Sequence, residues 1–87
     1  MIEVIRFYAD WCGPCKMLKP IMENVKSKSE GVSFKSYDVD KDYEIAQKYG
    51  IRSIPVVVLE KDGVEIERFS GLQSELAYTN AINEAKK

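Results

Sequence analysis

The sequence predicts an α/β domain with the element order β-α-β-α-β-β-α, in which helices cover both faces of a four-stranded mixed sheet. Two observations predict this fold class. Apolar strand-like segments alternate with segments of helical period, a pattern typical of strand-helix-strand units. The turn Lys61-Asp62-Gly63 separates the last two strand-like segments and predicts a hairpin. The chain is 87 residues long, and we expect residues 1–87 to form a single domain with a modest core.

The first strand is predicted over residues 1–8, which are apolar on both faces and are therefore expected at the centre of the sheet. The first helix is predicted from Pro14 to about Glu30, and Gly31 is its expected stop. Its core-facing residues recur every three or four positions. We expect the core to receive Met17, Leu18, Ile21, Met22 and Val25 from this helix.

The second strand is predicted over residues 32–39, parallel to the first because a helical crossover joins them. A short helix should follow, with Asp40 or Asp42 as its N-cap and Tyr49 near its end. Strands are then predicted over residues 56–59 and 64–69. The last helix should begin at the N-cap Ser74, and its apolar side should consist of Leu76, Ile82 and Ala85.

Composition excludes several function classes. The formal net charge is −1, and the chain has no long run of residues of one charge. We therefore expect no nucleic-acid partner. The longest apolar run, residues 54–59, is far below the ~20 residues that span a bilayer, and we expect no signal peptide in the first residues. We therefore expect a cytoplasmic protein without a membrane partner. The chain has no histidine, which excludes Cys-His and Ser-His hydrolases and histidine metal sites.

The only two cysteines lie two residues apart, in Asp10-Trp11-Cys12-Gly13-Pro14-Cys15-Lys16. In a reducing compartment, such close thiols are more often catalytic or metal-binding than structural. A metal ion would need two further ligands from a second chain or from solution, so we expect no metal site. Two thiols at this spacing can form a reversible disulfide within one helical turn. The pattern therefore predicts redox chemistry that needs no additional cofactor.

The position of each cysteine predicts its role. Cys12 lies where strand passes into helix, so its sulfur faces free backbone N–H groups and the positive end of the helix dipole. The thiolate is the nucleophile in disulfide exchange, which makes Cys12 the attacking residue. Cys15 lies one turn further along the helix and should be more deeply buried. When Cys12 attacks a substrate disulfide, a mixed disulfide forms between Cys12 and the substrate, and we expect Cys15 to resolve it. Gly13 allows a tight turn and Pro14 stiffens it, which should favour the dithiol and make the protein a reductant.

The stretch from Ala9 to Met17 resembles the active-site segment of thioredoxins. Three further segments resemble the same family in the same order: Val39–Asp42, Tyr49–Pro55 and Phe69–Gly71. The resemblance implies a minimal thioredoxin fold and a reductase of protein disulfides. It also implies a thioredoxin reductase or similar electron donor, and roles in electron transport and cell redox homeostasis. We expect a monomer.

Two departures from the family pattern concern the surroundings of the cysteines. Thioredoxins usually begin with an additional strand and helix, so this chain looks like the minimal core shared with glutaredoxins. Arg6 stands where many thioredoxins have a buried Asp, and Ser36 lies about where a lysine often pairs with that Asp. If Arg6 lies under the cysteines, it needs a carboxylate partner, for which Asp38 and Asp40 are candidates. Alternatively, its side chain extends to solvent.

Several site residues have two interpretations. Trp11 is either a core aromatic or an apolar patch that docks substrate. The resemblance implies a cis Ile54–Pro55 bond opposite the cysteines, beside backbone that pairs with substrate, whereas Pro55 could otherwise merely begin a strand. Gly71 either lines the substrate groove or ends a strand. Lys16 and Lys19 either assist the thiolate, as Arg6 could, or are solvated helix residues.

Two other functions also fit the sequence. A glutaredoxin-like, glutathione-dependent reductase is favoured by the short chain and opposed by the Trp-Cys-Gly-Pro-Cys motif. A binding module with a thioredoxin surface would need no redox chemistry. Activity with glutathione alone distinguishes the first, and full biological activity after replacement of both cysteines distinguishes the second.

Overall fold

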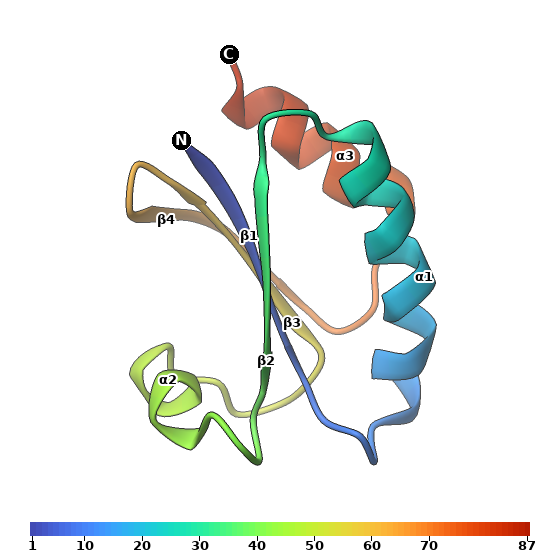
Figure 1. Cartoon of the computed structure of the whole chain (residues 1–87), viewed down its shortest axis with the longest axis vertical. Helices are drawn as coiled ribbons and strands as arrows, with labels where there is room; N and C mark the ends of the chain where they lie inside the picture. The colour runs from blue at the N-terminus through green and yellow to red at the C-terminus, as the bar shows by residue number, and fades with distance from the viewer.

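A computed structural model describes residues 1–87 and confirms the predicted order of elements (Figure 1). The elements are β1 (Ile2–Tyr8), α1 (Gly13–Lys28), β2 (Ser33–Asp38), α2 (Tyr43–Lys48), β3 (Val56–Lys61), β4 (Val64–Ser70) and α3 (Glu75–Ala85). Each predicted strand and helix is present, with ends that differ by one or two residues in most cases.

The four strands form one mixed sheet in the order β2-β1-β3-β4. Strands β1 and β2 are parallel, whereas β3 pairs antiparallel with both β1 and β4, as predicted. The carboxyl ends of β1 and β2 therefore lie at the same end of the sheet, which is the lower end in Figure 1. The N-terminus of α1 lies at that end too, directly after β1.

Helices cover both faces of the sheet, so the central strand β1 is buried on both sides. Ile2 and Val4 pack with residues of α1 and α3 in the larger hydrophobic cluster. Ile5 and Phe7 point to the opposite face, where Ala46 of α2 completes a smaller cluster. Figure 1 shows the same division, with α1 and α3 on one side of the sheet and α2 on the other. The expectation of a central, doubly covered first strand is confirmed.

Helix α1 buries Leu18, Met22 and Val25, as its period predicts. The prediction that Met17 belongs to the core is wrong, because 61% of its surface is exposed. Met17 lies about 100° around the helix axis from Leu18 and about 140° from Met22, so it falls outside the stripe that these two buried residues define. The helix ends at Lys28, two residues before the predicted end, and Ser29 is its C-cap.

The caps of the other helices are partly as predicted. The Ser74 side chain accepts a hydrogen bond from the Ala77 backbone N–H, 3.2 Å away, and so caps α3. Asp42 occupies the N-cap position of α2, but its carboxylate accepts from the Asp38 backbone N–H and makes no cap bond. Leu76 is 66% exposed, which contradicts its predicted place in the core. It lies about 200° around the helix from the buried Tyr78 and so faces away from the sheet.

The hairpin between β3 and β4 turns at Asp62 and Gly63, whose φ values of 53° and 83° lie in the left-handed region. Glycine adopts this conformation without steric cost, so the predicted turn is confirmed. Leu59 and Glu60 pair with Glu67 and Glu65, a shift that leaves one extra residue in β4 as a bulge. None of the helices combines the length and apolar character that crossing a membrane requires.

Candidate active site

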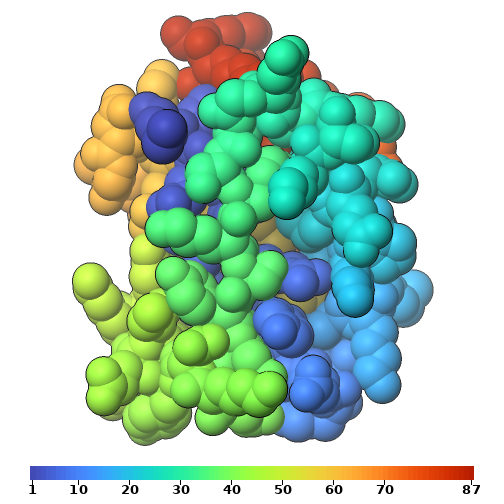
Figure 2. Space-filling model, viewed as in Figure 1, coloured from blue at the N-terminus to red at the C-terminus, as the bar shows by residue number.

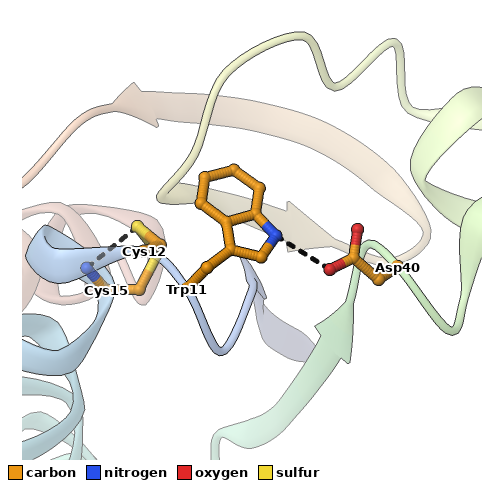
Figure 3. Close-up of a disulfide and its surroundings, with 4 residues drawn as sticks. All are labelled: Trp11, Cys12, Cys15 and Asp40. Carbon is orange, nitrogen blue, oxygen red and sulfur yellow. Dashed lines mark hydrogen bonds between the residues drawn. A yellow bond between two sulfur atoms is a disulfide. The ribbon is translucent and has the colours of Figure 1, made fainter.

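Cys12 and Cys15 form a disulfide at the junction of β1 and α1 (Figure 3). Their Cα atoms lie 5.2 Å apart. Strand β1 ends at Tyr8, and a short turn brings Cys12 to the first turn of the helix. The predicted intramolecular bridge is therefore present, and it lies at the sheet end where β1 and β2 both terminate.

Cys12 is the N-cap residue of α1, with an extended backbone at φ −85° and ψ 112°. Its Sγ accepts a hydrogen bond from the backbone N–H of Cys15, with a sulfur–nitrogen distance of 3.2 Å. The first turn of the helix holds no acidic residue, and its proline lacks an N–H of its own. A negative charge on this sulfur would thus meet a free N–H donor and the positive end of the helix dipole.

The two cysteines are equally buried, with 4% of each residue exposed. The expectation that Cys15 is the more deeply buried of the pair is wrong for this disulfide form. The reason is that Cys12, Cys15 and Ala9 form one small cluster, against which Ile54 and Val39 pack. Both sulfurs share the same cover because the bridge holds them together.

Trp11 is 69% exposed, so it is not the core aromatic that one interpretation predicted. Its indole Nε1 donates a hydrogen bond to Asp40 Oδ2 at 2.9 Å, and Asp40 lies in the loop that follows β2 (Figure 3). The backbone N–H of Asp40 in turn donates to the buried carboxylate of Asp38, also at 2.9 Å. The exposed indole is therefore fixed beside the disulfide by a chain of hydrogen bonds.

Sequence reasoning did not identify Asp40 as the partner of Trp11. The available signal was the parallel pairing of β1 and β2, whose carboxyl ends must lie side by side. A residue just after β1 and a residue just after β2 are then neighbours in space. Without the register of the two strands, the particular pair could not be chosen.

The Ile54–Pro55 peptide bond is cis, as the resemblance implied. Ile54 packs against the cysteine cluster, which places this segment at the disulfide. Pro55 is buried, and its carbonyl oxygen accepts a hydrogen bond from the Gly71 N–H at 2.8 Å. Gly71 has a φ of 86°, so a residue with a side chain would be strained there. Gly71 thus both ends β4 and joins the segment beside the cysteines.

Arg6 has no carboxylate partner, so the predicted pairing with Asp38 or Asp40 is wrong. Instead, its Nε donates to the Ser36 hydroxyl at 3.2 Å, and its guanidinium carbon lies 4.9 Å from the centroid of the Tyr8 ring. Burial lowers the pKa of the Arg6 guanidinium, and charge interactions with Tyr8 and Glu23 oppose this change. The side chain is half-buried rather than fully extended into solvent.

The remaining predicted residues lie around the same helix start. Lys16, Lys19 and Arg6 line an open cavity whose wall includes Cys15. Gly13 and Pro14 are exposed between the two cysteines, and nothing lies within 4 Å of the position that a Cβ on Gly13 would take. No group of three or more Cys, Asp or Glu side chains is placed to hold a metal ion.

Comparison with known proteins agrees with this geometry. The family model described as Thioredoxin matches residues 2–84. A thioredoxin of Chlamydia pneumoniae is 40% identical over 82 residues, which cover 94% of this chain and 80% of the relative. The structure of a mutant thioredoxin from Halobacterium salinarum superimposes with a TM-score of 0.91 at 37% identity, covering 99% of this chain and 75% of that one. For Fasciola hepatica thioredoxin the TM-score is 0.89 at 37% identity, with coverages of 97% and 80%.

Proposed function

This chain belongs to the thioredoxin family and is a protein-disulfide oxidoreductase, and we propose that Cys12 is its attacking residue and Cys15 its resolving residue. The observation that carries the assignment is the hydrogen bond from the Cys15 N–H to Cys12 Sγ at the N-cap of α1. This donor and the helix dipole favour a thiolate at Cys12 over one at Cys15, which lies inside the first turn.

The reaction proceeds in two exchanges. The Cys12 thiolate attacks one sulfur of the substrate disulfide, forms a mixed disulfide and releases the other substrate sulfur as a thiolate. The Cys15 thiolate then attacks Cys12 Sγ and releases the second substrate sulfur. Two electrons pass to the substrate, which takes up two protons, and the protein is left with the Cys12–Cys15 disulfide that the structure contains.

We propose that Trp11, the Ile54–Pro55 segment and Gly71 bind the substrate polypeptide. Three observations support this: the exposed indole lies beside the disulfide, Ile54 packs against the cysteines, and Gly71 is hydrogen bonded to Pro55. Gly13 and Pro14 would hold the loop between the two cysteines in a stiff turn and favour the reduced form. We further propose that Arg6 and Lys16 stabilise a thiolate, because both line the cavity that reaches Cys15.

The family implies disulfide-containing substrates and a reductase that supplies electrons. We propose that this donor is a thioredoxin reductase or a similar enzyme. We also propose that residues 1–87 act as a single-domain monomer in the cytoplasm, where the protein takes part in electron transport and cell redox homeostasis. The single four-stranded sheet supports the proposal of one domain.

Reduction of insulin disulfides tests the proposal when each electron donor is supplied in turn. We expect turnover with NADPH and a thioredoxin reductase, and little with NADPH, glutathione and glutathione reductase. The matched variants are Cys12→Ser, which should form no mixed disulfide, and Cys15→Ser, which should accumulate one through Cys12. Turnover with the glutathione system alone would instead identify a glutaredoxin-like reductase. A stable mixed disulfide on Cys15 in the Cys12→Ser variant would contradict the assigned roles.

A further inference from the structure

A groove runs between α1 and the β1–β2 side of the sheet, starting at the active site. Its first part is a cavity of about 280 Å³, lined by Arg6, Tyr8, Asp10, Cys15, Lys16 and Lys19. A second cavity of about 180 Å³ shares Arg6 and Lys19 and continues along α1 to Lys26. Figure 2 shows the hollow between the green β2 and the lighter-blue α1, with darker-blue atoms of the first residues at its floor.

The Arg6 guanidinium is fixed in this groove but not satisfied. The hydrogen bond from Nε to Ser36 and the contact with the Tyr8 ring hold the planar group in place. A guanidinium has five N–H donors, and only the one on Nε has a partner within the protein. Asp10 and Glu23 line the two cavities, yet neither forms an ion pair with Arg6. The fork of terminal amino groups is therefore free to receive an acceptor.

The charge of the groove contrasts with that of the chain. The protein carries a formal net charge of −1. Positive residues nevertheless outnumber the two carboxylates, Asp10 and Glu23, along the groove. They are Arg6, Lys16, Lys19, Lys26 and Lys35. Of these five, only Lys35 has an ion-pair partner, Glu3. A held guanidinium flanked by exposed lysines is suited to a carboxylate, which it can bind through two parallel hydrogen bonds.

We propose that this groove binds an acidic side chain of the protein substrate, located within a few residues of the substrate cysteine that Cys12 attacks. The proposal deepens the function proposed above and rests on it. Cys15 is part of the groove wall, and its sulfur is bonded to that of Cys12 in the structure. A peptide joined to Cys12 therefore begins beside the groove, and an extended chain advances about 3.3 Å per residue. We therefore place the acidic residue that Arg6 binds two or three positions from the substrate cysteine.

The inference predicts a preference among otherwise identical substrates. Two synthetic peptides would each contain one disulfide. One would carry Glu, and the other Gln, at the second and third residues on either side of each cysteine. Pre-reduced protein is mixed with increasing concentrations of each peptide, and acid-quenched samples give the rate of peptide reduction. We expect the wild-type protein to reach half-saturation at an about tenfold lower concentration of the Glu peptide, the factor that ~1.4 kcal/mol of binding supplies.

The variants separate this preference from general effects on the thiols. In Arg6→Gln the ratio between the two peptides should fall to about one, and any effect of Arg6 on the cysteines cancels in that ratio. Arg6→Lys should restore part of the preference, because it keeps the charge but not the fork. The double variant Lys16→Gln, Lys19→Gln should reduce the ratio severalfold. Both lysines are exposed, so their replacement should leave the packing of the core unchanged. The matched control is Lys48→Gln on α2, on the opposite face of the sheet, which should keep the full ratio.

Two results would overturn the inference while leaving the proposed function intact. One is equal half-saturation for both peptides in a wild-type protein that reduces insulin normally. The other is an unchanged ratio in the Arg6→Gln variant or, if that variant does not fold, in the Lys16→Gln, Lys19→Gln double variant. By contrast, a wild-type protein that reduces neither peptides nor insulin would show that the proposed function itself has failed.

Discussion

Replacement of Asp40 should release the exposed indole beside the disulfide. Asp40 Oδ2 accepts the only hydrogen bond that the Trp11 side chain makes, at 2.9 Å. A net contribution of about 1 kcal/mol is appropriate for a bond that remains exposed to solvent. That energy corresponds to a roughly fivefold change in the ratio of held to released indole. The Asp40→Ala variant should therefore lose less than about 1 kcal/mol of unfolding free energy, while Trp11 samples several positions.

The consequence for activity follows from the proposed docking role of Trp11. With insulin as substrate, we expect KM to rise by about two- to fivefold in Asp40→Ala and kcat to change little, because the cysteines are untouched. Trp11 is the only tryptophan, so time-resolved fluorescence anisotropy reports its motion directly. Asp40→Asn is the matched control, since its amide oxygen can still accept the bond. The reasoning is refuted if Asp40→Ala has the anisotropy and KM of the wild type.

Three further predictions concern the redox pair, the packing of α1 and the hydrogen bond of a tyrosine. Cys15→Ser should trap substrate as a mixed disulfide that non-reducing mass spectrometry detects; release of substrate at the wild-type rate would argue against a resolving role. Leu18→Ala should lower the free energy of unfolding by about 2–5 kcal/mol in urea titrations, whereas Met17→Ala, at an exposed position, should lower it by less than ~0.5 kcal/mol. Equal losses for the two would contradict the assigned faces of α1. The hydrogen bond to Glu60 raises the pKa of Tyr49 to about 12 from an ordinary value of 10. Stability should therefore fall as the pH rises from 10 to 12, and Tyr49→Phe should make thermal unfolding less sensitive to pH in that range.

The parts of the fold that sequence predicts well are those with local causes. The turn at Asp62 and Gly63 and the cap at Ser74 need only the conformation or hydrogen bond of a few adjacent residues. The wrong predictions of burial concern apolar residues that lie next to the buried stripe of a helix. Met17 and Leu76 are apolar neighbours of the buried stripes, yet tertiary packing leaves both exposed. Apolar character alone does not determine which side of a helix faces the sheet.

At the active site, sequence predicted the residues but not all of their partners. The place of Cys12 at a helix start follows from the order of strand and helix, and the structure adds the N–H donor. The bonds from Trp11 to Asp40 and from Arg6 to Ser36 join residues about 30 positions apart. Those pairs depend on the register between β1 and β2, in which Arg6 lies opposite Ser36. A search for opposite charges favoured Asp38 and Asp40 for Arg6, whereas the register selects a hydroxyl.

The central claim is that the N-terminus of α1 makes Cys12 ionise more easily than a free thiol. The rate of iodoacetamide alkylation of the fully reduced protein, followed over roughly pH 5 to 10 with peptide mapping, tests it most directly. The account predicts that Cys12 reacts first, with a midpoint at least about one pH unit below the ~8.5 of free cysteine, and that Cys15 stays largely unmodified. Equal modification of both residues with a midpoint near that of free cysteine would contradict it.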